Sequence, residues 1–146
     1  MSERPAGSRY AGDFNWGVIE DFRAHGGQIT QGPFRGRKLL LLTTTGARTA
    51  QARINPLVYT RDGDRYVVIA SKGGAPTNPD WYHNLVKNPR VTVEVGPERF
   101  QALARVAEGA ERERLYDAQA ALMPNFAEYQ RRTGRRIPVV VLERVG

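Results

Sequence analysis

Short turns join most of the apolar segments of this 146-residue chain, and this spacing constrains the fold more than any other feature. The apolar segment 37–44 turns at Gly46 into segment 52–60, where Pro56 is typical of an edge strand or a bulge. An Asp-Gly pair at 62–63 is a hairpin signal. Parallel strands need crossovers of a dozen or more residues, so turns this short predict antiparallel pairing.

Strand and helix signals along the rest of the chain complete the expected architecture. The predicted strands are 37–44, 52–60, 65–70, 91–95, 99–106 and 137–142. The predicted helices are one capped by Asp13 and ended by Gly26-Gly27, one capped by Asn78 with Pro79 first and ended near Asn88-Pro89, one with Leu115, Ala118 and Leu122 on its apolar stripe, and a short one from Pro124 to Arg131. We therefore expect an α+β fold, an antiparallel barrel with peripheral helices, in which residues 1–12 are a flexible tail and residues 13–146 form one domain.

The chain is basic, with 22 Lys and Arg against 15 Asp and Glu and a net charge of +7. Such a surface favours an anionic partner, which leaves nucleic acid, anionic lipid, a phosphorylated cofactor or no partner at all as interpretations. The basic residues are spread out, so no nucleic-acid-binding arm is predicted.

Several chemistries are excluded by residue content. No cysteine is present, which removes disulfides, thiolate metal sites and cysteine nucleophiles. The two histidines, His25 and His83, have no metal-ligand spacing, and we expect no metal. The longest apolar run, 39–42, is too short to span a bilayer, and residues 1–10 contain no apolar signal segment, so a cytoplasmic protein is expected.

Two loops could bind an anion. The turn 43–49 combines threonine hydroxyls, backbone N–H groups and Arg48, with Arg53 just beyond, although a plain hairpin turn explains it equally well. The segment 69–74 ends a strand with two glycines, which let a ligand approach the backbone. Both loops are expected to leave neighbouring strands at the same end of the sheet. The helix start near Trp81 adds N–H donors, and Trp81 itself suits either a pocket or the core.

No set of side chains forms a recognisable catalytic group. A Gly-x-Ser-x-Gly motif is absent, and Ser71 has no neighbour in sequence that would activate it. This indicates a cofactor that carries the chemistry itself.

Three segments together resemble the deazaflavin-dependent nitroreductase family. They are LLLLTTTGARTAQARINPLVY, VIASKGGAPTNPDWYHNL and NPRVTVEV, and the resemblance extends from Phe14 to the IPVVVLERV end. The resemblance implies a split β-barrel related to the pyridoxamine-phosphate oxidase fold, using reduced coenzyme F-420, in an actinobacterial type of enzyme. A deazaflavin has carbon at ring position five and delivers two electrons as hydride.

The resemblance also implies a set of site residues. It assigns the cofactor phosphate and acidic tail to Thr43, Thr44, Thr45, Gly46, Arg48, Thr49 and Arg53, the ring edge to Asn55 and Pro56, the ring and ribityl chain to Ala70, Ser71, Lys72, Gly73 and Gly74, and the rest of the pocket to Asn78 and Trp81. Relatives often carry a basic residue at both positions after the TTTG glycine, whereas Ala47 fills the first position here.

The substrate side is assigned to the segment 123–129. Met123 and Phe126 stand where nitroimidazole-activating relatives carry tyrosines, and only Tyr129 keeps a phenol. Tyr129 and Ser71 are the candidate catalytic residues. We expect hydride transfer to a planar acceptor, a quinone, enone or nitro compound, with contact to a membrane surface if the acceptor is a membrane quinone.

Other interpretations remain open. They are an oxidoreductase of the same fold that uses flavin mononucleotide (FMN), a cofactor carrier without turnover, and a nucleic-acid-binding barrel. Both a monomer and a homodimer fit an edge strand interrupted by Pro56.

Overall fold

The computed structural model describes residues 12–145, with side chains from Asn15 onward. The tail predicted over residues 1–12 therefore lies outside the described residues, apart from Gly12. The elements are α1 (Gly12–Ala24), β1 (Leu39–Thr45), β2 (Ala52–Val58), β3 (Thr60–Asp62), β4 (Arg65–Ile69), a 3-10 turn (Lys72–Gly74), α2 (Asp80–Lys87), β5 (Arg90–Val95), β6 (Glu98–Val106), α3 (Gly109–Leu122), α4 (Asn125–Arg132) and β7 (Val139–Arg144).

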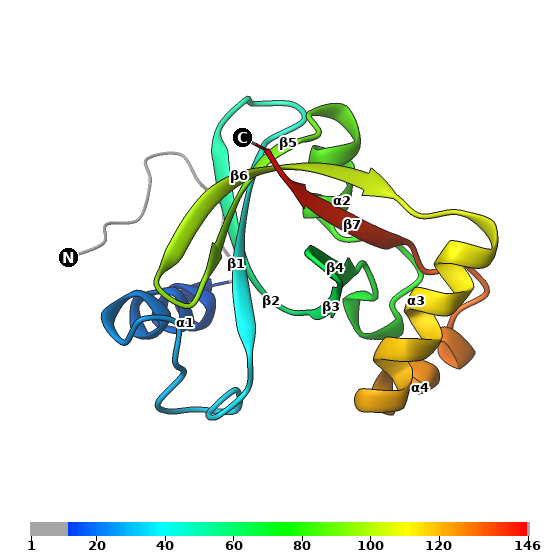
Figure 1. Ribbon diagram of the computed structural model, residues 1–146, viewed down its shortest axis with the longest axis horizontal. Helices are drawn as coiled ribbons and strands as arrows, with labels where there is room; N and C mark the ends of the chain where they lie inside the picture. The colour runs from blue at the N-terminus through cyan, green and yellow to red at the C-terminus, as the bar shows by residue number, and fades with distance from the viewer. Residues whose placement is uncertain (1–11, 146) are drawn as a thin grey trace.

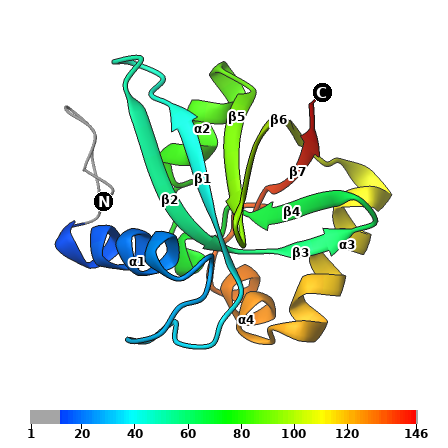
Figure 2. The same ribbon diagram turned by 60° about the vertical axis from the view of Figure 1, so that its left-hand side comes forward.

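All strands belong to one antiparallel sheet in the order β2-β1-β5-β6-β7-β4-β3. The sheet curls into a half-barrel, with α1 on one side and α3 and α4 on the other (Figures 1 and 2). The α+β antiparallel barrel predicted from the short turns is confirmed. Pro56 lies in β2, at one end of the sheet and opposite Leu41, as its lack of an N–H group predicts.

Two predictions about the strands are wrong. The expected strand 52–60 is two strands, because the chain leaves the sheet edge after Val58 and begins β3 at Thr60, which pairs with β4 across the Asp-Gly turn. The described residues thus form seven strands and not six. The two loops predicted to bind an anion follow β1 and β4, which were expected to be neighbours. In the sheet, β5, β6 and β7 lie between these two strands.

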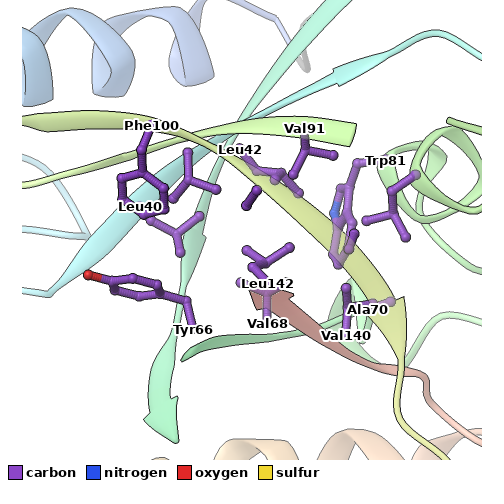
Figure 3. Close-up of a cluster of buried hydrophobic side chains, with 14 residues drawn as sticks. Leu40, Leu42, Tyr66, Val68, Ala70, Trp81, Val91, Phe100, Val140 and Leu142 are labelled. Atoms are coloured by element: carbon purple, nitrogen blue, oxygen red, sulfur yellow. The ribbon is translucent and has the colours of Figure 1, made fainter. Parts of the chain in front are cut away.

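Strand β1 is buried on both faces, and this explains its run of four leucines. Leu40 and Leu42 point into the barrel, where they pack in a cluster that Phe100 and Tyr66 close at one end and Trp81 at the other (Figure 3). The alternate residues Leu39 and Leu41 pack in a second cluster with α1. A third cluster joins β4 and β7 to α3 and α4.

The helices form where predicted, but three details are wrong. Helix α1 begins at Gly12, so Asp13 lies inside it and is not its N-cap. Helix α2 has Pro79 at its N-cap position without a side-chain cap, because the Asn78 carboxamide oxygen accepts a hydrogen bond from Arg135 instead. The buried side chains of α3 are Arg112, Leu115, Tyr116 and Gln119, whereas Ala118 and Leu122 are exposed.

Helix α3 buries the charged side chain of Arg112, which is satisfied by hydrogen bonds. Arg112 donates from Nε and Nη2 to the carbonyl oxygen of Ile137, at 3.2 and 2.7 Å, and from Nη2 to Gln130 Oε1 at 2.8 Å.

No helix in the described part of the chain has both the length and the apolar character needed to cross a membrane.

Candidate functional site

A cavity of about 730 Å³ lies between β2, the start of α2, the 3-10 turn and α4. Its volume is within the range of small-molecule and cofactor sites. The predicted cofactor residues that line it are Arg53, Asn55, Pro56, Ser71, Lys72, Gly73 and Trp81. All three predicted substrate residues, Met123, Phe126 and Tyr129, line it as well. The two halves of the predicted site therefore share one cavity.

Cations dominate the charged residues around the cavity. Among the described residues, Arg37, Arg53 and Lys72 line it, and Asp80 contributes the one carboxylate. Arg53 Nη2 donates to Thr49 Oγ1 at 3.1 Å, while Arg53 Nη1 is buried and has no hydrogen-bond partner among the described residues. A buried guanidinium donor without a partner carries an unfavourable desolvation free energy, which an anionic ligand would offset.

The turn after β4 has a backbone shape that suits an anion. Ser71 has helical dihedral angles, φ −74° and ψ −39°, and Lys72 and Gly73 follow with φ 49° and 64°. A right-handed residue followed by a left-handed one makes successive N–H groups converge into an anion-binding nest. The left-handed conformation is strained for Lys72, a residue with a Cβ atom. Such strain is found at ligand-binding sites.

Gly74 brings this turn against α4. It has φ 83°, and a Cβ atom on it would lie 3.0 Å from the carbonyl oxygen of Tyr129 and 3.1 Å from Arg132 Cβ. Only a glycine permits the two backbones to approach this closely. The position of the wall that carries Tyr129 is therefore linked to the position of the turn.

The turn 45–52 is held by α2 through a residue that sequence analysis missed. Asn84 is buried, donates from Nδ2 to Thr44 Oγ1 at 3.1 Å, and accepts at Oδ1 from the backbone N–H of Ala47 at 2.9 Å. Lys87 Nζ donates to the carbonyl oxygen of Ala47 at 2.7 Å. Asn84 also lines the cavity. Its partners lie about 40 positions away in the sequence, so no local pattern marks it.

The structure separates several predicted residues from the cavity. Thr43, Thr44 and Thr45 line a second, open hollow of about 520 Å³ on β1, β5 and β6, together with Arg90, Thr92 and Gln101. Arg48 is exposed in the turn 45–52, and Thr49 reaches the site only through Arg53. Gly46, Ala70, Gly74 and Asn78 are not among the lining residues. Gly46 shapes its turn, since a Cβ atom there would lie 2.8 Å from Thr49 Oγ1.

Apolar and aromatic side chains from the start of α4 form the wall opposite the cations. The Phe126 and Tyr129 rings pack edge to face with centroids 5.2 Å apart. Asn125 Nδ2 donates to the Tyr129 hydroxyl oxygen at 2.7 Å. The Tyr116 hydroxyl of α3 donates to the carbonyl oxygen of Phe126 and thereby fixes the start of α4. Burial raises the pKa of Tyr116.

No pair of described side chains in the cavity has the geometry of a nucleophile and its base. The Ser71 side chain forms no hydrogen bond with a described residue, and neither histidine lines the cavity. The arrangement offers anion binding on one side and a flat, apolar surface with one phenol on the other. This combination can hold a charged cofactor against a planar substrate, and the redox chemistry would come from that cofactor.

Comparison with known proteins agrees with this geometry. Residues 18–144 match a family model described as F420H(2)-dependent quinone reductase. An F420H(2)-dependent quinone reductase of Mycobacterium tuberculosis is 49% identical over 108 residues, which are 72% of this chain and 72% of that protein.

Solved structures show the same similarity. A structure described as an F420-H2 dependent reductase (FDR-A) is 40% identical, has a TM-score of 0.67, and covers 72% of this chain and 93% of its own. A structure described as a domain-swapped dimer is 36% identical, has a TM-score of 0.70, and covers 88% of this chain and 97% of its own. A pyridoxamine 5'-phosphate oxidase-like protein from Listeria innocua, at 14% identity and a TM-score of 0.53, shares the split-barrel fold.

Proposed function

Because this chain belongs to the F420H(2)-dependent quinone reductase family, we propose that it transfers a hydride from reduced coenzyme F-420 to a quinone. One observation supports this most directly: a single cavity is lined by the cations Arg37, Arg53 and Lys72 and also by the aromatic side chains of Phe126 and Tyr129. The cationic side suits a phosphorylated and acidic coenzyme, and the apolar side suits a planar acceptor.

The residues of the cavity fit the coenzyme. Arg37, Arg53 and Lys72 bring positive charge for a phosphate, and the N–H groups of Ser71 to Gly73 add a backbone nest. Gly73 has no side chain to block access to this nest. Arg48, exposed on the neighbouring turn, would contact the acidic tail outside the cavity.

Reduced deazaflavin supplies two electrons as a hydride. The protein must then hold the acceptor flat, exclude water and stabilise negative charge on the acceptor oxygen. Met123 and Phe126 provide the apolar contact. The Tyr129 hydroxyl accepts its hydrogen bond from Asn125, which leaves its own proton available for donation to that oxygen. Ser71, buried beside the nest, contributes a second hydroxyl to the cavity.

A titration tests this function. The purified protein is titrated with coenzyme F-420 and, separately, with FMN, while the fluorescence of each ring is followed. The reduced complex is then mixed anaerobically with a soluble naphthoquinone, and oxidation of the coenzyme is monitored. We expect binding of the deazaflavin and oxidation on mixing. Tight binding of FMN without a response to the deazaflavin would overturn the proposal, and binding without oxidation would favour a carrier.

We further infer that residues 13–146 act as one deazaflavin-binding domain, which the single continuous sheet supports. A cytoplasmic location is also proposed, because the coenzyme must be reduced again after each turnover by metabolic enzymes in the same compartment. A homodimer is the assembly that the domain-swapped relative favours, and light scattering of the full chain measures it.

A further inference from the structure

Arg135 connects the end of α4 to the turn that borders the cavity. It lies between α4 and β7, yet its side chain reaches a segment 57 to 65 residues earlier in the chain. Its guanidinium donates from Nε to the carbonyl oxygen of Ala75 at 2.9 Å, from Nη1 to the carbonyl oxygen of Ala70 at 3.2 Å and Asn78 Oδ1 at 2.7 Å, and from Nη2 to the carbonyl oxygen of Ser71 at 2.7 Å. All three nitrogen atoms are thus used on one loop.

The backbone around Arg135 is itself held by hydrogen bonds. Gln130 of α4 donates from Nε2 to the carbonyl oxygen of Arg135 at 2.8 Å. The Gln130 Oε1 atom accepts from the backbone N–H of Ile137 at 3.1 Å and from the buried Arg112. Arg135 therefore spans from a rigid junction to a loop that has no strand or long helix of its own.

Arg135 is bound without a counter-ion. No carboxylate of a described residue pairs with it, and burial lowers the pKa of its guanidinium. A partly buried charge satisfied only by neutral acceptors is a costly way to stabilise a fold, since apolar side chains fill such space as well or better. Its hydrogen bonds to the consecutive carbonyl groups of Ala70 and Ser71 indicate that it fixes the orientation of the backbone there.

The direction of these carbonyl groups determines where the nest points. The peptide group 70–71 carries the Ala70 carbonyl and the Ser71 N–H, and the peptide group 71–72 carries the Ser71 carbonyl and the Lys72 N–H. Because no cis peptide bond is present in the described chain, N–H and C=O of each group point in opposite directions. With both carbonyls turned toward Arg135, the N–H groups of Ser71 and Lys72 point away from it.

We propose that Arg135 is a positioning residue for the coenzyme site: it holds the turn 71–74, which is left-handed from Lys72 to Gly74, and so orients the N–H groups of Ser71 and Lys72 for the anionic coenzyme. This rests on the proposed function. The strained φ of Lys72 requires such a restraint, because the turn would otherwise relax. The packing of Gly74 on α4 means that the same restraint fixes the distance between the nest and Tyr129.

Trypsin cleavage reads the conformation of the turn without any coenzyme. Lys72 is an exposed trypsin site within the turn, whereas Arg112 is a buried trypsin site in α3. Mass spectrometry of the full-length protein follows the fragments that end at each residue. We expect R135A to be cleaved faster after Lys72 and at the wild-type rate after Arg112, which separates local opening from global unfolding.

Coenzyme affinity is measured on the same proteins. R135A should raise the dissociation constant of coenzyme F-420 about tenfold, the range expected when hydrogen bonds to a charged group are lost. Millimolar ethylguanidinium, which replaces the missing group, should restore both the affinity and the slow cleavage after Lys72 in R135A and leave the wild type unchanged. The matched control is R136A, which removes the same charge from the neighbouring position, where the side chain is exposed and paired with Glu113.

Two results would overturn the proposal: unchanged cleavage after Lys72 in R135A, or faster cleavage with unchanged affinity. If R135A does not fold, R135K, which keeps the charge and loses the planar fork, is judged by the same two readouts. A wild-type protein that binds no coenzyme overturns the proposed function, whereas the cleavage comparison still decides whether Arg135 holds the turn.

Discussion

At the scale of single residues, the cavity depends on side chains with unused hydrogen-bonding capacity. Arg53 has a buried donor without a partner, and Tyr129 has a hydroxyl proton that its bond with Asn125 leaves available. Both groups were expected from the sequence, but their partners were not. Thr49 and Asn125 are each four positions away, and many side chains at that spacing do not meet.

Tyr129→Phe should slow quinone reduction without changing coenzyme affinity. Loss of a positioned proton donor lowers a rate by about a hundredfold or more, and the ring that packs on Phe126 is retained. Stopped-flow oxidation of the reduced coenzyme measures the rate. The control is Tyr82→Phe, which removes a hydroxyl from a half-buried tyrosine of α2 outside the cavity. A wild-type rate in Tyr129→Phe would mean that the proton comes from elsewhere.

Asp21 makes the stability of the protein depend on pH in the acid range. Thr30 donates to its carboxylate from Oγ1 at 2.7 Å and from the backbone N–H at 2.9 Å, and these bonds lower the pKa of Asp21 below 3.8. The stabilisation is therefore complete above the unfolded-state pKa and is lost as pH falls through the lower folded-state pKa.

Urea unfolding of the wild type and Asp21→Asn tests this. The variant should be less stable at neutral pH, and the difference in unfolding free energy should shrink as the pH falls below 3.8. Asp117→Asn, at an exposed position of α3, removes the same charge as a control. A difference that is constant with pH would contradict the role of the Asp21 carboxylate.

At the scale of elements, two turns far apart in the sequence meet at glycines. Gly27 follows α1 with φ 95°, and Gly96 joins β5 to β6 with φ 56°. A Cβ atom on Gly27 would overlap the backbone of Gly96, whereas a Cβ atom on Gly26, with φ 61°, would have no neighbour within 4 Å. Arg23 reinforces this contact of α1 with β5, because it donates to Glu94 from Nη2 at 2.8 Å.

Gly27→Ala should therefore destabilise the fold more than Gly26→Ala. Both substitutions place a side chain at positive φ, at about 1 kcal/mol, but only Gly27→Ala also displaces a turn, which adds about 1–3 kcal/mol. Chemical denaturation of the two variants measures the unfolding free energies. Equal losses would show that the turns can separate without consequence.

The elements themselves were largely predictable because their signals are local. Alternating valines in β5, the Asp-Gly turn before β4 and Pro56 at the sheet edge act within a few residues, and each prediction is confirmed. Helix α3 forms as predicted, but its buried face was predicted wrongly, because apolar periodicity cannot identify a buried Arg112 whose acceptor, Ile137, is 25 residues away. The cap at Asn78 failed for the same reason, since Arg135 competes for it from 57 residues away.

At the scale of the whole molecule, the net charge of +7 does not by itself indicate a binding site. A site is indicated only where the fold brings several cations together. Arg37, Arg53 and Lys72 come from three separate segments and meet around the cavity. The sequence predicts an anionic partner and the loops involved, but Thr43 to Thr45 line the second hollow and Asn84, which lines the cavity, has no local sequence signal. Which side of β1 faces the cavity depends on the curl of the sheet, and a linear pattern does not specify this.

Coenzyme affinity should decrease as the salt concentration rises. The loss of affinity caused by Arg53→Ala should be largest at low ionic strength. We expect Arg53→Ala and Lys72→Ala to weaken binding about tenfold at low salt, with a smaller difference at high salt because exposed charges are screened. Arg48→Ala reports on the acidic tail in the same way. Fluorescence titration over a range of salt concentrations measures the affinities, with Arg90→Ala, on the second hollow, as the control of equal charge. Wild-type affinity in all three variants would place the anion elsewhere.

Pro56 has a consequence for the behaviour of the protein at high concentration. An open sheet has two free edges, and strands from other molecules can add to them and start aggregation. Here one edge, β3, is only three residues long, and the other, β2, lacks a donor at Pro56. A half-barrel with four consecutive leucines in β1, the strand beside this edge, is thereby protected from polymerising through its edges. Replacement of Pro56 by a residue with an N–H group would restore a donor on this edge strand and so favour association between molecules.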